Sequence, residues 1–178
     1  EICDHPEIKA IAFVGSSNVA KTVYSRSTSK GKRALCLGGA KNHMIVVPDA
    51  DQDSTAKGLL ASSMGSAGQR CMAASVALGV ANVDPIIDQL VDEAKKLKLG
   101  VDMGTIINAS SLARIENYIE ESKKMGAEVL IDGRDIIPPK GFENGFWLGP
   151  TILDQVDPDW PCAKEEIFGP VLSIIRTD

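Results

Sequence analysis

Short apolar runs alternate along the chain with longer segments in which apolar residues recur every three or four positions. The first run, Ile8 to Val14, predicts a buried strand that stops at Gly15. Ser16 and Ser17 come next and offer caps for the segment that follows, which predicts a helix. A strand, a glycine turn and a helix in this order form one β-α step.

The middle of the chain predicts two short strands and a helix. The segments KRALCLGG and HMIVVPDA predict strands joined by a two-glycine turn. Asp53 or Ser54 predicts the cap of a helix whose apolar positions have helical spacing and run towards Gly68. The residues just after that helix therefore lie in a connection between a helix and the next strand.

The second half of the chain repeats the alternation of strands and helices. Asp84 and Pro85 mark the start of one helix, and Gly126 marks the end of another. In chain order the predicted elements are SVALGV, DPIIDQLVDEAKKLKLG, SSLARIENYIEESKKM, AEVLI, FWLGPTIL and GPVLSII. This order of elements is typical of an α/β fold with a largely parallel sheet.

Composition and charge exclude several classes of function. The 178 residues are 44% hydrophobic and 24% charged, which is ordinary globular usage, and the formal net charge is −5. An acidic chain without clustered basic residues argues against a nucleic-acid partner. The longest apolar runs, such as MIVV and VLSII, are too short to cross a bilayer, and the first residues do not form a secretion signal. We expect neither a membrane nor a nucleic acid as partner.

The cysteines and histidines are too few and too scattered for a metal site. There are only two histidines, and no pair of cysteines has C-x-x-C spacing. The simplest interpretation is a chain with free thiols in a reducing compartment. The four cysteines are Cys71, Cys36 in a predicted strand, and Cys3 and Cys162 in predicted loops.

Among these thiols, Cys71 has the surroundings that best fit a nucleophile. Its neighbours in SMGSAGQRCMAAS are small enough to let a substrate approach, and Arg70 beside it favours a thiolate. The alternative is a buried structural cysteine, which is the more common case for this residue type. Sequence spacing assigns neither His5 nor His43 as its base.

Two further segments could bind a ligand or could be purely structural. Gly15 and Ser16 open a helix after a strand, where free backbone N–H groups hold anions, although any β-α connection needs such a turn. Glu165 and Glu166 run directly into an apolar Ile-Phe pair, so one carboxylate could turn inward, whereas adjacent carboxylates usually lie on a solvated loop.

Taken together and in order, these motifs resemble the aldehyde dehydrogenase superfamily, and the resemblance covers essentially all 178 residues. Within it, the segments GAKNH, GQRCMA and FENGFWLGPTI are most similar to the CoA-acylating methylmalonate-semialdehyde dehydrogenase branch. The motifs that carry the resemblance are FVGSSNVAK, LCLGGAKNH, GQRCMA, GPTIL and KEEIFGPVL.

The resemblance implies a role for Cys71 and for its neighbour. Cys71 matches the family nucleophile, which attacks the aldehyde carbon and contributes its own N–H to the oxyanion hole. Arg70 matches a position that binds the substrate carboxylate in the semialdehyde branch, where a guanidinium makes a bidentate pair. Lys41, Asn42 and His43 mark the branch and receive no chemical role.

The resemblance also implies NAD as cofactor. Gly15 and Ser16 match the turn that contacts the cofactor diphosphate. Glu166 matches the carboxylate that holds the nicotinamide ribose hydroxyls, and Phe168 matches the aromatic residue that packs near the nicotinamide.

The chain departs from the family pattern at the residue that activates water. Hydrolytic members have a glutamate upstream of the nucleophile, but alignment places Cys36 or Leu37 there. A thiol with a pKa of about 8.5 is already partly thiolate at neutral pH and needs no such base. The resemblance therefore implies coenzyme A as acyl acceptor, and oxidation of methylmalonate or malonate semialdehyde to propionyl-CoA or acetyl-CoA with loss of CO₂. Even within the acylating branch Leu37 is unusual, and the segment KLKLGVDMGTII is shorter than the family loop.

Two other functions stay open at this point. One is a hydrolytic, CoA-independent semialdehyde dehydrogenase, and the other is a catalytically idle structural module. We expect residues 1–37 to be the end of a Rossmann-type nucleotide-binding domain, and residues 38–178 to be an α/β catalytic domain, incomplete at its end, with a mainly parallel sheet. We also expect the chain to be an inactive fragment of a longer homodimeric or homotetrameric enzyme, cytoplasmic in bacteria and in the mitochondrial matrix of eukaryotes.

Overall fold

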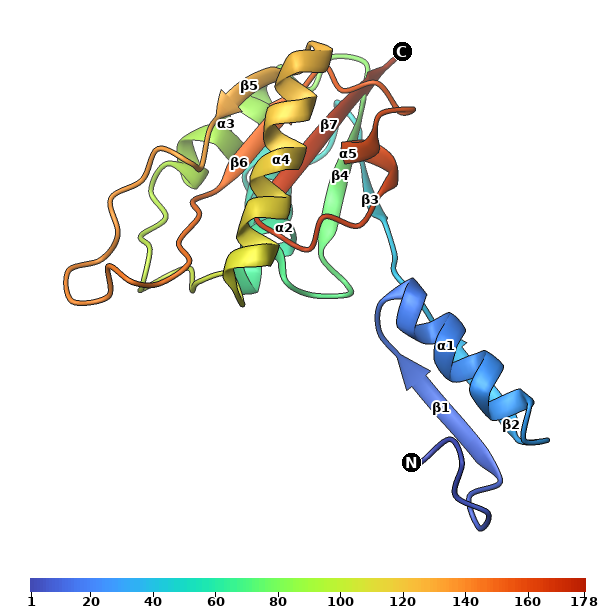
Figure 1. The fold of residues 1–178 in the computed structure, drawn as a ribbon. Coiled ribbons are helices and arrows are strands. Elements are labelled where there is room, and N and C mark those ends of the chain that lie inside the picture. The colour runs from blue at the N-terminus through green and yellow to red at the C-terminus, as the bar shows by residue number, and fades with distance from the viewer. The chain divides into compact units, whose positions relative to one another are not determined.

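The computed structural model describes residues 1–178, which form two compact units, Glu1–Ala40 and Lys41–Asp178 (Figure 1). Each unit has its own sheet. The strand before Gly38 and Gly39 belongs to the first sheet and the strand after them to the second. These glycines therefore join two units, and the prediction of a simple turn between two strands was wrong.

The first unit is a parallel β-α-β arrangement. Strand β1 (Ala10–Val14) leads into helix α1 (Ser17–Thr28), and strand β2 (Arg33–Leu37) returns beside β1. In this register Phe13 pairs with Cys36, and the N–H of Gly15 donates to the carbonyl oxygen of Leu37 at 3.1 Å. Burial alternates along both strands between exposed and half-buried residues, because helix α1 covers only one face of a two-stranded sheet. The prediction of a buried strand from Ile8 to Val14 was therefore wrong in its burial, and the strand begins only at Ala10.

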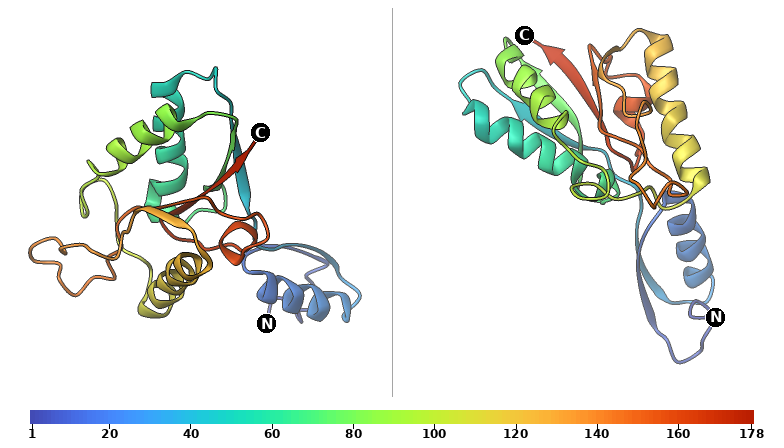
Figure 2. Two further views of the ribbon diagram at one scale, coloured as in Figure 1. Left: turned by 90° about the horizontal axis from the view of Figure 1, so that it is seen from above. Right: turned by 90° about the vertical axis from the view of Figure 1, so that its left-hand side faces the viewer.

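The second unit is built on a five-stranded sheet of order β3-β4-β7-β6-β5, in which only β5 is antiparallel. Figure 2 shows α2 and α3 on one face of this sheet and α4 and α5 on the other. The elements are β3 (Asn42–Val46), α2 (Gln52–Met64), β4 (Ala74–Val80), α3 (Asp84–Ala94), α4 (Ala109–Met125), β5 (Glu128–Ile131), β6 (Thr151–Asp154), α5 (Pro161–Lys164) and β7 (Val171–Thr177).

The predicted α/β class and mainly parallel sheet are confirmed, and the core lies where helices cover both faces of the sheet. All four residues of β6 and the first five of β7 are buried. Strands buried on both faces consist of continuous apolar runs rather than alternating ones, which is the pattern of Val171 to Ile175 apart from Ser173. Ile152, Leu172 and Ile174 are inaccessible to solvent.

The helix boundaries follow local chemistry, with corrections to the predictions. Gly126 ends α4 in a left-handed conformation (φ 112°), as predicted. Helix α2 is capped by Asp51, whose carboxylate accepts a hydrogen bond from the N–H of Ser54 at 2.8 Å, so the prediction of Asp53 or Ser54 was wrong. Asp84 is the first residue of α3, after the capping position of Val83.

Three other expectations about local structure need correction. The FWLGP segment is irregular, and β6 begins only at Thr151. Cys162 lies buried in the short helix α5, not in a loop. Helix α2 ends at Met64, because the residues before Gly68 take left-handed backbone conformations. No helix in the chain combines the length and the apolar character that crossing a membrane requires.

Candidate active site

Cys71 lies in the connection between α2 and β4. We call this segment (residues 65–73) the nucleophile loop, after the predicted role of this cysteine. It is exposed, whereas Cys3 and Cys36 are half-buried and Cys162 is buried. The loop precedes the first residue of β4, so the thiol lies at the amino edge of this strand. Cys71 is therefore not buried within this chain, and its role as a nucleophile stays a prediction.

The loop is held by side chains on both sides of the cysteine. The Asn42 amide donates to the carbonyl oxygens of Cys71 (2.8 Å) and Ala73 (3.0 Å). The hydroxyl of Ser62 accepts from the N–H of Ala74 at 3.1 Å. An exposed loop residue is thus attached to a backbone that is fixed at several points.

Gln69 fastens the same loop to the segment before α4. Its side-chain amide donates to the carbonyl oxygen of Thr105 (3.0 Å) and accepts from the N–H of Ile107 (2.9 Å). Both polar atoms of the side chain are therefore used to bridge two loops.

A left-handed turn brings the nucleophile loop against the segment that follows α5. Ser66, Ala67 and Gly68 have φ of 54°, 51° and 67°, a conformation that costs non-glycine residues roughly 1–2 kcal/mol each. A Cβ atom on Gly68 would lie 2.0 Å from the carbonyl oxygen of Gly169. Only glycine permits this approach, which places the segment 165–169 beside the loop that carries Cys71.

Arg70 folds back along α2. Its Nη2 atom donates to the carbonyl oxygens of Ala61 (2.7 Å) and Ser62 (2.8 Å), where the helix dipole favours a cation. Nε and Nη1 have no partner within the chain. Two guanidinium nitrogens thus remain available for a carboxylate, and the predicted role in substrate binding stays a prediction.

The segment with the predicted cofactor residues is itself anchored and strained. Tyr118 on α4 donates a hydrogen bond to the carboxylate of Glu165, whereas the half-buried carboxylate of Glu166 has no partner within the chain. Partial burial and the bond to Glu165 raise the pKa of Tyr118 to about 12. Phe168 has φ of 55° and is 37% exposed, so a bulky aromatic residue holds a left-handed conformation at this turn.

Lys41 carries the most perturbed charge close to this segment. Its Nζ atom is buried and has no hydrogen-bond partner. Burial lowers the pKa of Lys41 to about 8, against the opposing influence of Cys162, Glu166 and Glu165. The ammonium group of Lys41 is attracted by two carboxylates but pairs with neither, and its burial penalises its charge.

In the first unit, Gly15 and Ser16 occupy the start of α1. Ser16 is the capping residue, but its side chain makes no capping bond, and the first turn contains no acidic residue. The first N–H groups of the helix are therefore free to meet an anion. A Cβ atom on Gly15 would lie 2.6 Å from the ring of Phe13.

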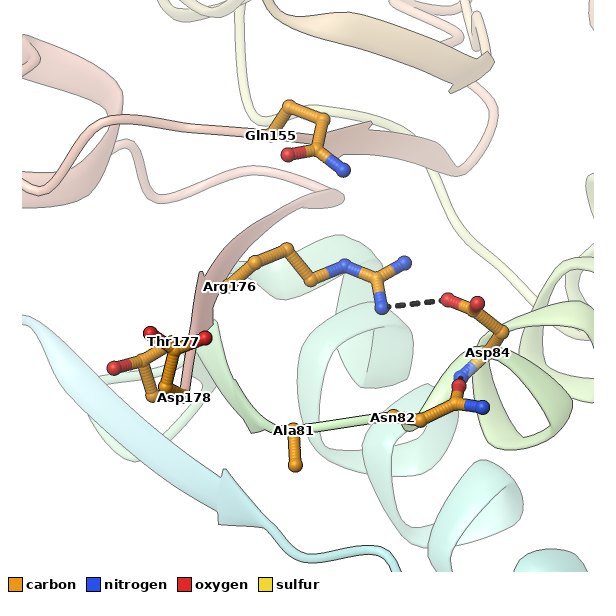
Figure 3. Close-up of a pocket in the computed structure, with 7 residues that line it drawn as sticks. All are labelled: Ala81, Asn82, Asp84, Gln155, Arg176, Thr177 and Asp178. Atoms are coloured by element: carbon orange, nitrogen blue, oxygen red, sulfur yellow. Dashed lines mark hydrogen bonds and ion pairs between the residues drawn. The ribbon is translucent and has the colours of Figure 1, made fainter.

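A cavity of about 590 Å³ opens at the other edge of the second sheet, at the carboxyl ends of β4 and β7 (Figure 3). Open α/β sheets often bind ligands at this edge. Here, however, Arg176 makes a bidentate pair with Asp154 (2.9 and 2.6 Å) and bonds to Asp84 at 2.8 Å. These carboxylates raise the pKa of Arg176 further and already neutralise its guanidinium. The charge of Arg176 is therefore no argument for an anionic ligand in this cavity.

Comparison with known proteins decides the family. The model of the Aldehyde dehydrogenase family matches residues 1–178. This chain belongs to the aldehyde dehydrogenase family. The chain is 45% identical, over 99% of its length, to the acylating methylmalonate-semialdehyde/malonate-semialdehyde dehydrogenase of Bos taurus mitochondria, and spans 34% of that protein. It is 44% identical over 97% of its length to the malonate-semialdehyde dehydrogenase of Pseudomonas aeruginosa, and spans 36% of it.

Solved structures of family members agree with these relatives. A Sinorhizobium meliloti protein, whose crystal structure is a complex with NAD, is 44% identical and superposes with a TM-score of 0.94 over 99% of this chain and 37% of the other. The chain thus spans about a third of the length of the curated relatives it matches. The predicted membership in the aldehyde dehydrogenase family and the predicted fold are confirmed.

The structure brings together residues that the sequence kept apart, and adds three that it did not reveal. It places the nucleophile loop with Cys71 beside the segment of Glu166 and Phe168. Asn42, Gln69 and Tyr118 were not predicted as site residues, although Asn42 was noted as a marker of the branch. Each forms hydrogen bonds to backbone atoms or a side chain that lie far away in the sequence. Such contacts cannot be predicted from the spacing of residues in a motif.

Proposed function

We propose that the protein with this chain oxidises methylmalonate or malonate semialdehyde to propionyl-CoA or acetyl-CoA, with NAD as hydride acceptor and with loss of CO₂. The observation that carries the proposal is the exposed thiol of Cys71 on a loop fixed at several points, next to the segment of Glu166 and Phe168. Relatives of that name at about 45% identity support this choice of substrate.

In this proposal Cys71 forms the covalent intermediate. Its thiolate adds to the aldehyde carbon, and the resulting alkoxide accepts a hydrogen bond from the N–H of Cys71, which has no partner within the chain. Loss of hydride converts the adduct into a thioester on Cys71. The β-carboxylate of this thioester leaves as CO₂, because the thioester carbonyl accepts the electron pair, and a proton then replaces it.

Each of the two units contains residues whose chemistry suits a part of NAD. The uncapped start of α1, with Ser16 and Gly15, offers free N–H groups to the diphosphate. The unpartnered carboxylate of Glu166 fits ribose hydroxyl donors, and the exposed ring of Phe168 offers an apolar face to the nicotinamide. Bound NAD would supply the hydride acceptor for the adduct on Cys71.

Arg70 fits the substrate carboxylate. Its two bonds to the end of α2 fix the guanidinium and leave Nε and Nη1 free. A guanidinium held in this way, one residue before the nucleophile, would orient a short semialdehyde with its carbonyl near Cys71.

Coenzyme A is proposed as acyl acceptor because the chain offers no acid in place of the family's water-activating glutamate. Leu37 is 50% exposed at the end of β2, and Cys36 lies half-buried before it. Leu37 has no group that accepts a proton, and Cys36 offers a thiol in place of the carboxylate. A thiol acceptor that ionises near neutral pH needs no such base.

Three further expectations, on domain boundaries, oligomeric state and location, belong to this proposal. We propose residues 1–37 as the end of the nucleotide-binding domain and residues 38–178 as part of the catalytic domain. We also propose that the full-length enzyme is a homodimer or homotetramer, located in the bacterial cytoplasm or the mitochondrial matrix.

The test is the CoA dependence of NADH formation by the full-length protein that contains this chain. With methylmalonate semialdehyde and NAD, we expect one NADH per active site without CoA, from formation of the thioester, and steady turnover to propionyl-CoA after CoA is added. Steady NADH formation and release of a free acid without CoA would instead establish the hydrolytic function. A Cys71→Ala variant that is as active as the wild type would rule out the proposed chemistry.

A further inference from the structure

We propose, on the basis of the proposed function, that Asn42 is the residue that positions the nucleophile. Asn42 opens β3, 29 residues before Cys71, and its amide nitrogen donates to the carbonyl oxygens of Cys71 and Ala73 at 2.8 and 3.0 Å. One side chain thus holds two points of the nucleophile loop.

The direction of the thiol is fixed because both peptide groups that adjoin Cys71 are held by hydrogen bonds, one of them from Asn42. The carbonyl of Arg70, in the preceding peptide group, accepts a hydrogen bond from the N–H of Ala73 at 3.1 Å. The carbonyl of Cys71, in the following one, accepts from Asn42. With both peptide planes held, the Cα–Cβ bond that carries Sγ and the N–H that faces the developing alkoxide keep fixed directions.

The sheet is irregular at this point, and the irregularity places the amide. In the pairing of β3 with β4, Asn42 pairs with Ala74 but His43 pairs with Val76, so one residue of β4 is skipped. Such bulges redirect a side chain and often lie next to active sites. The half-buried Asn42 side chain is thereby aimed at the loop before β4, not across the strand pair.

An asparagine is suited to this task by its two amide hydrogens, one for each carbonyl oxygen. Aspartate has nearly the same shape but no hydrogen to donate at neutral pH, and its charge would repel both carbonyls. Alanine removes the bonds without adding a charge. These two substitutions separate the loss of the bonds from the effect of a new charge.

The first experiment measures the loop directly and does not depend on activity. Hydrogen exchange of the Ala73 and Ala74 amides would be followed in the full-length protein and in the Asn42→Ala and Asn42→Asp variants. We expect exchange to be faster by about tenfold or more in both variants. The matched control is Asn117→Ala, which removes a hydrogen bond of similar length to Glu121 on the exposed side of helix α4. This variant should leave the exchange rates of the Ala73 and Ala74 amides unchanged.

The second experiment separates positioning from general stability. We expect both Asn42 variants to lower kcat by at least about tenfold, with a dissociation constant for NAD within twofold of the wild type. Asn42→Ser keeps one donor on a shorter side chain and should give intermediate exchange and activity, which provides a milder variant if the others fold poorly.

The outcomes distinguish this proposal from the proposed function. Unchanged exchange at Ala73 and Ala74, or unchanged kcat in an active enzyme, would overturn the role of Asn42. Equal loss of kcat and NAD binding would overturn it as well, because it would indicate a general structural defect. A wild-type protein that forms no NADH from the semialdehyde would instead contradict the proposed function, while the exchange experiment would still decide whether Asn42 fixes the loop.

Discussion

The hydroxyl of Tyr118 donates a hydrogen bond of 2.5 Å to the carboxylate of Glu165 and so ties helix α4 to the residue before Glu166. The two residues are 47 positions apart in the sequence. The bond restrains the turn that carries the predicted cofactor carboxylate, while that carboxylate keeps its own hydrogen-bonding capacity. The geometry of Glu166 therefore depends on a helix that lies on the face of the sheet opposite to α2.

Removal of this tether should weaken cofactor binding. In Tyr118→Phe the ring still packs but the bond to Glu165 is lost, so we expect the dissociation constant for NAD to rise several-fold, with a melting temperature close to that of the wild type. Fluorescence titration with NAD and thermal unfolding measure the two quantities. Tyr24→Phe, at the other tyrosine of the chain, is the control and should change neither. Wild-type affinity in Tyr118→Phe would contradict this role.

Gly68 should tolerate no side chain. Because its backbone approaches that of Gly169 and its φ is 67°, Gly68→Ala must both strain the turn and push two loops apart. We expect it to lower the free energy of unfolding by about 1–3 kcal/mol and to abolish most NADH formation.

The control for Gly68 is Gly58→Ala in the interior of α2, where a Cβ atom would meet nothing within 4 Å. This change should stabilise the protein by roughly 0.5–1 kcal/mol, because alanine favours a helix. Urea unfolding of both variants provides the comparison. A Gly68→Ala variant as stable as the wild type would show that the two loops can separate without cost.

The buried amine of Lys41 should make stability depend on pH. In the unfolded chain its pKa is near the ordinary 10.5, but burial lowers it to about 8 in the folded protein. Between these values the unfolded state binds more protons, so folding stability linked to Lys41 rises as pH rises from about 8 to 10.5. The cost of the buried charge is fully present below about pH 8.

Lys41→Met should therefore be most stabilising, relative to the wild type, near pH 7.5, and this advantage should shrink towards pH 10.5. Urea unfolding at several pH values measures the difference between the two proteins, which cancels the titration of other groups. Lys95→Met, at an exposed lysine of the C-terminal end of α3, is the control and should show no such trend. A difference that does not vary with pH would contradict the buried charge.

The thiols should react in the order of their exposure. With limiting iodoacetamide under native conditions, we expect Cys71 to be labelled first and buried Cys162 last, with Cys3 and Cys36 between them. Mass spectrometry of the labelled peptides measures the order, and labelling in denaturant should make the four rates similar. Preferential labelling of Cys162 would show that helix α5 opens easily.

The hydrophobic periodicity of the sequence, with its glycine, proline and capping residues, was sufficient to predict most helices and strands. The apolar run before Gly15 and the glycine at 126 are local signals, and the structure has a strand and a helix end there, although the strand is not buried. The start of α2 was predicted wrongly, because Asp51, Asp53 and Ser54 are all good caps and only the path of the chain out of β3 selects among them. The local pattern did not show that β2 and β3 lie in two sheets, since two glycines can form a turn or a connection between units. The expected domain boundary after residue 37 came from the family resemblance instead.

By itself the sequence determined the family, the α/β class and the candidate residues Cys71, Arg70, Glu166 and Phe168, because short motifs with fixed spacing carry that information. Only the tertiary structure decided that Gly68 meets Gly169 and that Asn42 holds the loop of Cys71. These contacts join residues about 30 to 100 positions apart, and in each of them at least one partner is a backbone carbonyl oxygen. Because every residue has this group, the pattern of side chains does not reveal which one is contacted. The sequence thus specified the candidate reactive groups, and packing between distant segments specified their positions.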